Sequence, residues 1–146
     1  LQQDINLDQS LGWINSATNP NLGGINSFQA LSVKSGILKK KGKNEESDLI
    51  MKQAIDNANT MELHQYGRQL LNEKKVNEAM TVFEKNYIKN KGAWPTNVGM
   101  MRAHSALGNI KKALEFAREA LKQAPDDINK KNLENAIETL ESGKAL

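Results

Sequence analysis

Small and apolar residues recur along this chain at steps of three and four, which place them on one face of an α-helix. Three segments that share this pattern align with one another, starting 32 and 34 residues apart: 43–54, 75–86 and 109–120. Their common small residue is Ser47, Ala79 or Ala113, which lets a neighbouring helix approach closely. One turn later, Met51 or Phe83 is large enough to fill the space between repeats. The repeat therefore predicts packed helices.

A second helical pattern precedes each of these segments and ends at Gly42, Lys74 or Gly108. Glycine here can take the left-handed conformation that ends a helix, whereas Lys74 lacks that freedom. Helices are predicted at 4–17, 27–41, 45–58, 61–73, 76–89, 95–107, 110–123 and 127–142, with a loop at 18–25. The residues that suit the helix starts are Asn26 or Ser27, Thr60 and Asp126 as caps, and Pro95 in a first turn.

These residues resemble the tetratricopeptide repeat over about residues 28–127. The matching positions are Leu31, Leu38, Gly42, Ser47, Met51, Ala54, Leu63, Gly67, Leu70, Ala79, Phe83, Gly108, Ala113, Ala120 and Pro125. Three positions depart from the pattern: Lys74 replaces a turn glycine, Asn86 a small residue and Ala117 a bulky one.

The resemblance implies an all-α protein, a right-handed superhelical stack of antiparallel helix hairpins. We expect one domain over 1–146, with a half repeat and loop at 1–25 and a capping helix at 126–146. The repeats are expected at 26–59, 60–93 and 94–125. Because helix 4–17 has an apolar stripe and no partner helix before it, we expect the chain to be a fragment of a longer protein.

A second resemblance concerns residues 7–14 and 30–38. These segments are similar to the helical tail of a family of exported bacterial proteins of unknown function, in which a β-rich domain comes first. The resemblance implies a periplasmic or otherwise exported location and an amino-terminal domain before Leu1.

Composition narrows the possible chemistry. The net charge is only +3, so no strong long-range field and no obligatory nucleic-acid partner is expected. The absence of cysteine excludes disulfides, thiolate metal sites and cysteine nucleophiles. No segment approaches the roughly 20 apolar residues of a membrane span. The basic run 39–43 is interpreted as a helix end kept soluble by lysines, and the alternative is contact with phosphate or nucleic acid. No cofactor or metal is expected.

The resemblance also implies a concave groove lined by the first helix of each hairpin. The groove residues carried over are Ser32, Gly36, Lys39, Lys40, Met61, His64, Arg68, Asn72, Val98, Arg102 and Ser105. We select six of them as a candidate peptide groove: His64, Arg68, Asn72, Arg102, Ser105 and Lys39. His64 and Arg68 lie four residues apart, and with Arg102 they would hold a carboxylate or an acidic peptide. The alternative is that these are ordinary solvated charges.

Three functions are compatible with these observations. The first is a non-catalytic scaffold that binds a protein or peptide in the groove, with His64, Arg68 and Arg102 exposed. The second is a structural appendage of a larger exported protein, whose exposed amino-terminal helix favours self-association. The third is an enzyme, although no nucleophile or metal motif indicates one. His104 is interpreted as a packing residue, and Trp13 and Trp94 as either recognition or packing residues.

Overall fold

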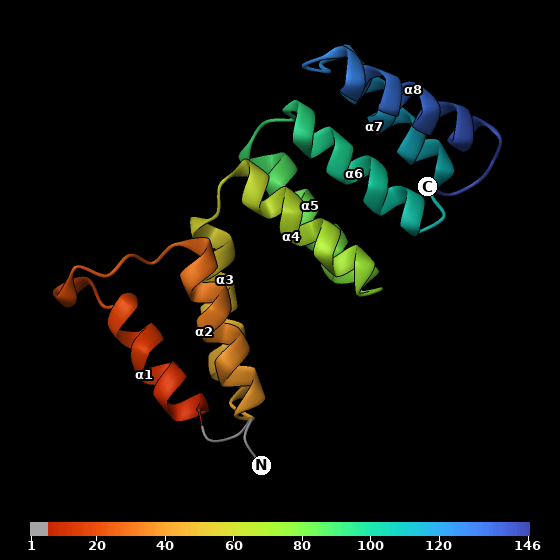
Figure 1. Cartoon of the computed structure of the whole chain (residues 1–146). Helices are drawn as coiled ribbons and strands as arrows, with labels where there is room; N and C mark the ends of the chain where they lie inside the picture. Colours follow the sequence, from red (N-terminus) through yellow and green to blue (C-terminus); the bar gives the residue numbers. More distant parts are fainter. Residues whose placement is uncertain (1–5) are drawn as a thin grey trace. The chain divides into compact units, whose positions relative to one another are not determined.

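A computed structural model of the chain describes residues 6–146, and this part is entirely helical apart from its turns and loops (Figure 1). It contains eight α-helices and one short 3₁₀-helix: α1 (Leu7–Ala17), η1 (Pro20–Leu22), α2 (Phe28–Lys40), α3 (Asn44–Asn57), α4 (Thr60–Asn72), α5 (Val76–Lys89), α6 (Trp94–Ala106), α7 (Ile110–Lys122) and α8 (Asp127–Glu141). The chain divides into two compact units, Leu1–Ala58 and Asn59–Leu146. The finer division into repeats stays a prediction.

The all-α prediction is confirmed, and seven of the eight predicted helices agree with the structure to within one residue at each end. The exception is the first, which begins at Leu7 and not at position 4; positions 4 and 5 lie outside the described residues. The predicted loop at 18–25 contains the helical turn η1. Pro20 is the first residue of η1, and its ring fixes its own φ angle in the helical range. The Asn19 side chain caps η1 by accepting a hydrogen bond from the Asn21 N–H.

The helix caps agree with the sequence at two of three positions. Ser27 accepts a hydrogen bond from the Ala30 N–H, and Asp126 accepts one from the Asn129 N–H. The assignment of Thr60 as a cap is wrong, because Asn59 caps α4 in its place. Asn59 forms a reciprocal capping box with Glu62, whose carboxylate accepts the Asn59 N–H at 2.9 Å.

Three hairpin turns share one backbone geometry. The φ angles of Gly42, Lys74 and Gly108 are 76°, 61° and 74°. The residue after each of them donates its N–H to a carbonyl five residues earlier, as in the bond from Lys75 to Leu70 at 2.9 Å. Lys74 therefore adopts the left-handed conformation that glycine adopts in the other two turns, and its Cβ is strained there.

Replacing Lys74 with glycine is expected to raise the free energy of unfolding of unit Asn59–Leu146 by about 1 kcal/mol, because it removes the steric cost of a left-handed lysine. Lys74→Ala removes the same charge but keeps the Cβ, so it should give no such gain. Urea denaturation of the three proteins measures the difference. Equal gains from both substitutions would assign the effect to the lysine charge.

In unit Leu1–Ala58, small polar residues join α2 to α3. The Ser35 and Ser47 hydroxyls lie 2.9 Å apart. The Ser47 hydroxyl also donates to the Ser35 carbonyl at 2.9 Å. Both serines are buried. Because their side chains are small, α2 and α3 lie close enough for a hydroxyl on one helix to bind a backbone carbonyl on the other.

In unit Asn59–Leu146, Phe83 on α5 is fully buried between two glycines. A Cβ on Gly67 of α4 would lie 2.5 Å from its ring, and a Cβ on Gly99 of α6 would lie 2.3 Å from it. Asn86, which departs from the repeat pattern, is also fully buried. Its side-chain amide donates to the Thr60 carbonyl at 3.0 Å, which offsets the loss of hydration.

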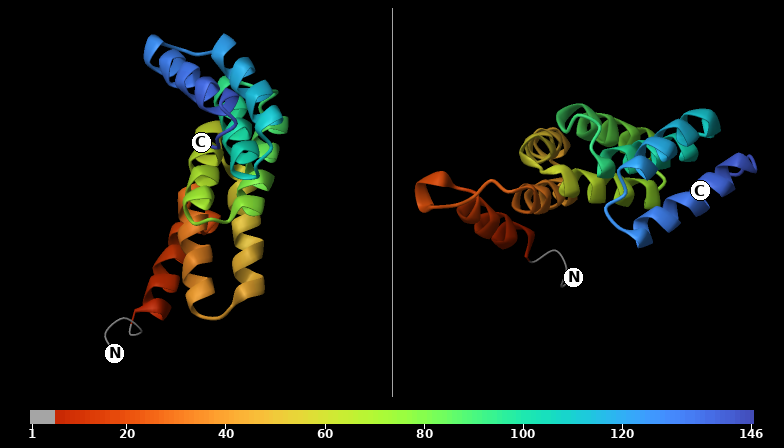
Figure 2. Two further views of the ribbon diagram at one scale, coloured as in Figure 1. Left: turned by 90° about the vertical axis from the view of Figure 1, so that its right-hand side faces the viewer. Right: turned by 90° about the horizontal axis from the view of Figure 1, so that it is seen from above.

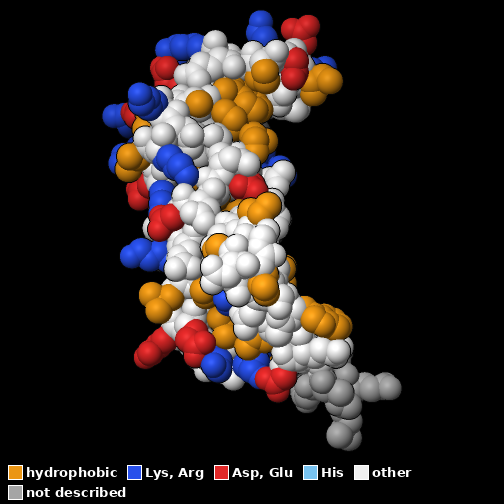
Figure 3. All heavy atoms as spheres, turned by 90° about the vertical axis from the view of Figure 1, so that its left-hand side faces the viewer, with side chains coloured by type: hydrophobic (Ala, Val, Ile, Leu, Met, Phe, Trp, Pro, Cys, Tyr) orange, Lys and Arg blue, Asp and Glu red, His pale blue; other side chains and the backbone are white. Residues whose placement is uncertain are grey.

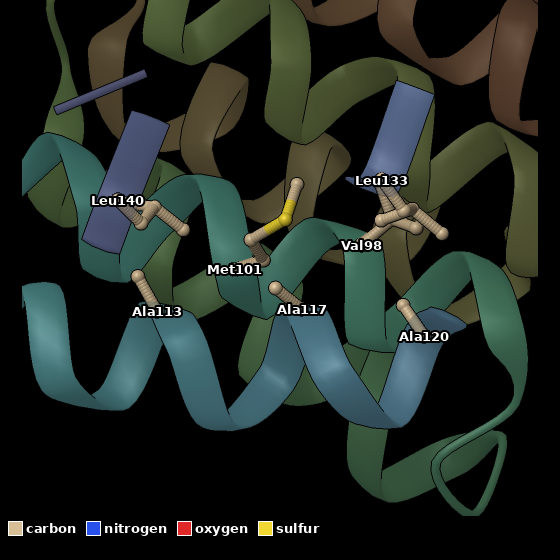
Figure 4. Close-up of a cluster of buried hydrophobic side chains, with 7 residues drawn as sticks. All are labelled: Val98, Met101, Ala113, Ala117, Ala120, Leu133 and Leu140. Atoms are coloured by element: carbon tan, nitrogen blue, oxygen red, sulfur yellow. The ribbon is translucent and has the colours of Figure 1, made fainter. Parts of the chain in front are cut away.

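The rest of this core lies between α6, α7 and α8, which Figure 2 shows from two further directions. Three alanines form the buried face of α7: Ala113, Ala117 and Ala120. Figure 4 shows them beneath Val98 and Met101 of α6, together with residues of α8. Alanine at position 117, where the repeat usually has a bulky residue, keeps this face flat and allows close helix packing.

Candidate functional site

A cavity of about 310 Å³ lies within unit Asn59–Leu146. Helices α4, α6 and α8 and the final residue of the chain line it: His64, Arg68, Trp94, Val98, Met101, Arg102, Asn129, Asn132, Leu133, Ala136 and Leu146. Val98, Met101 and Leu133, visible in Figure 4, also belong to the hydrophobic core, so one wall of the cavity is apolar and rigidly held.

Three buried nitrogen atoms among the residues that line the cavity lack a hydrogen-bonding partner in the described part of the chain: His64 Nδ1, Trp94 Nε1 and Arg102 Nε. An unpaired polar atom in the protein interior is unfavourable by about 1–3 kcal/mol. Trp94 Nε1 and Arg102 Nε each carry a hydrogen that can be donated, so a ligand with acceptor oxygens would recover part of this free energy. This part of the cavity therefore suits an acceptor-rich group.

The charges at the cavity are basic. Burial lowers the pKa of the His64 imidazole; a backbone hydrogen bond to Pro95 opposes this shift, and the charges of Arg102 and Arg68 add to it. Burial and the neighbouring Arg68 likewise lower the pKa of Arg102. Since both charged groups that perturb His64 are guanidinium groups, an anionic ligand is favoured over a cationic one.

The structure brings together three of the six selected groove residues: His64, Arg68 and Arg102. Ser105 lies nearby on α6, where its hydroxyl accepts a hydrogen bond from the Leu146 N–H at 2.8 Å. Asn72 is exposed in the last turn of α4 and does not line the cavity. Lys39 is exposed near the end of α2 in the other compact unit.

The expectation that His64 is exposed is wrong, since only 8% of its surface is accessible. Its ring lies against Phe83, with centroids 5.9 Å apart and planes tilted by 58°. Arg68 is exposed as expected, and Arg102 is half-buried. The histidine therefore belongs partly to the core, and its Nδ1 is a buried polar atom of the site.

Sequence reasoning missed the wall that α8 contributes. Asn129 and Asn132 lie three residues apart on α8, and both line the cavity. Their spacing on one helical face is a usable signal, but the sequence predicts this helix only as a capping helix. Trp94 lines the same cavity, which gives it a place in the site as well as in the core.

The second histidine has a packing role, as the sequence indicated. His104 is 5% exposed and stacks on Phe116, with ring centroids 5.4 Å apart. Within residues 6–146, no group of histidine and carboxylate side chains is arranged to hold a metal ion. No helix in the same part of the chain is long and apolar enough to cross a membrane.

Acidification below about pH 6.5 is expected to lower the free energy of unfolding of unit Asn59–Leu146. Burial lowers the pKa of both His64 and His104 in the folded chain, so between these pKa values and about 6.5 the unfolded chain binds more protons. This contribution is complete above the unfolded pKa and is lost as the pH falls through the window. Urea denaturation at pH values from about 8 to about 5.5 measures this loss of free energy. His64→Gln is the control, and its free energy of unfolding should depend less on pH than that of the original chain. NMR titration that placed the His64 pKa above 6.5 would contradict the expectation.

The fold and the stacked helix pairs define an α-helical repeat protein. The family model described as tetratricopeptide repeat matches residues 102–127, from the second half of α6 through α7 to the first residue of α8. The chain therefore carries a repeat of the tetratricopeptide family, in the third of the predicted hairpins. No curated protein and no solved structure shows a significant match.

Proposed function

We propose that this chain is a non-catalytic scaffold that binds a protein or peptide partner through a carboxylate in the cavity between α4, α6 and α8. A tetratricopeptide repeat suggests an interaction scaffold, which supports the general class. The observation that carries the specific proposal is that the Arg68 and Arg102 guanidinium groups line one cavity with Trp94, and that Trp94 Nε1 and Arg102 Nε are buried without a partner within residues 6–146.

Size and chemistry favour a short part of a peptide as the ligand. At about 310 Å³ the cavity is at the lower end of small-ligand pockets, so it accommodates one or two residues. Two guanidinium groups can form charge-assisted hydrogen bonds with a carboxylate. Val98 and Leu133 offer an apolar surface to the neighbouring side chain.

A broad electrostatic surface is not needed for this proposal. On the face shown in Figure 3, basic and acidic side chains are interspersed, with hydrophobic side chains between them. Together with the net charge of +3, this distribution favours local recognition by a few residues over long-range attraction of a polyanion. Nucleic acid is therefore not the proposed partner.

The experiment compares the intact chain with Arg68→Ala plus Arg102→Ala, using eight-residue acidic peptides with free and with amidated carboxyl termini. Trp94 lines the cavity, and Trp13→Phe makes it the only tryptophan, so its fluorescence reports binding. We expect the double arginine variant to lose about tenfold or more in affinity. Lys130→Ala plus Lys131→Ala, which removes two exposed charges of α8, is the matched control. Equal binding by the arginine variant and the control would remove the two arginines from the proposal.

One observation favours a second role, that of a structural appendage that self-associates. In unit Leu1–Ala58 an apolar groove of about 580 Å³ lies between α1 and α2, lined by residues that include Trp13 and Val33. These two side chains are 62% and 54% exposed. Light scattering of the chain and of Trp13→Ser tests this role: a concentration-dependent dimer that the substitution abolishes would support it.

A further inference from the structure

The segment that follows α8 turns back toward the cavity. Gly143 has a φ of 78°, and the Lys144 N–H donates to the Thr139 carbonyl at 3.3 Å, which reverses the chain direction after the helix. Residues 144–146 are exposed, yet Leu146 lines the cavity beside Arg102 and His64. Leu146 therefore lies at the candidate site although it contributes little to the core.

Leu146 is held at one point by a buried group. Its N–H donates to the Ser105 hydroxyl at 2.8 Å, across 41 residues of sequence, and Ser105 is only 1% exposed. About half of the Leu146 surface is covered, since the residue is 49% exposed. A backbone N–H and an aliphatic side chain are features that any peptide containing a leucine-like residue possesses.

This attachment is weak. One hydrogen bond between neutral groups contributes little net stability, and ordering a short exposed segment opposes it. A segment bound so weakly is displaced readily by a ligand that also reaches the two arginines. The apparent affinity for the ligand is then the intrinsic affinity multiplied by the fraction of molecules in which the segment leaves the site free.

We propose that residues 144–146 are an internal competitor for the cavity, and that the external peptide presents a leucine-like residue in the place of Leu146, its N–H bound to Ser105. The inference rests on the proposed function, because it assigns the partner and the regulation of the same cavity. The two groups of Leu146 that compete with the peptide are its backbone N–H, which binds Ser105, and its side chain.

The test uses a synthetic peptide with the sequence of residues 141–146 as the probe, and the chain shortened after Gly143 as the receptor. NMR titration should show the peptide binding to the shortened chain about three- to tenfold more tightly than to the intact chain. Leu146→Gly keeps the N–H that binds Ser105 but removes the side chain, so its affinity for the probe should lie between those of the intact and the shortened chains. Lys144→Ala, whose exposed side chain is outside the cavity, should behave like the intact chain.

A peptide with the same residues but glycine in place of the leucine is the probe control and should bind less tightly. Ser105→Ala should weaken binding of the leucine probe to the shortened chain and should release the Leu146 N–H in the intact chain. Equal affinities of the shortened and intact chains for the probe would overturn the competition. Binding of the acidic peptides tests the proposed function separately. If acidic peptides bind the intact chain but the leucine probe binds neither form, this inference fails and the proposed function stands.

Discussion

Replacing Phe83 with alanine is expected to lower the free energy of unfolding of unit Asn59–Leu146 by about 3–5 kcal/mol. The ring is fully buried, and it fills the space that Gly67 and Gly99 leave between α4, α5 and α6. The helices cannot close this space without moving as rigid bodies, so the substitution leaves a cavity in addition to removing apolar contacts.

Urea denaturation followed by circular dichroism measures this loss. Ile88→Ala is the control on the same helix, because Ile88 is 77% exposed and its truncation removes little buried surface. Phe83→Leu should give an intermediate loss. A cost below about 1 kcal/mol for Phe83→Ala would mean that the helices repack around the smaller side chain.

Replacing Gly99 with alanine is expected to destabilise the same unit by about 1–3 kcal/mol through overpacking. The new Cβ would lie 2.3 Å from the Phe83 ring, and Gly67→Ala would place a Cβ 2.5 Å from it. The aromatic ring is enclosed on both sides, so it cannot move away from one glycine without approaching the other.

The control is Gly36→Ala, where a new Cβ would meet nothing within 4 Å. This substitution should stabilise unit Leu1–Ala58 by about 0.5–1 kcal/mol, because alanine is the better helix former. A double-mutant cycle makes the test specific: in a Phe83→Leu background, Gly99→Ala should cost less than in the original chain. An unchanged cost would exclude the ring as the source of the clash.

The helix boundaries could be predicted because local physics determines them. Small and apolar residues at helical spacing identify the buried faces, and the turn after α4 forms even with Lys74 in place of glycine. The Thr60 cap was wrong because Asn59 and Glu62 form a capping box one residue earlier, which was present in the sequence as a local signal.

The cavity could be predicted only in part. The family resemblance selected His64, Arg68 and Arg102, which the structure brings together. The contributions of α8 and Leu146 depend on contacts between residues far apart in the sequence, and no local pattern announces the bond between Leu146 and Ser105. The burial of His64 against Phe83 has the same origin. The exported location and the preceding domain implied by the second resemblance stay predictions.

The position of Phe83 also affects how the protein can be divided. Repeat arrays often gain or lose terminal repeats independently, because each repeat contacts only its neighbours. Here one aromatic side chain on α5 contacts glycines on α4 and α6, and α6 belongs to the next predicted repeat. We therefore expect these three helices to unfold together, and we expect the smallest autonomously folding piece of this region to extend across the boundary between two predicted repeats.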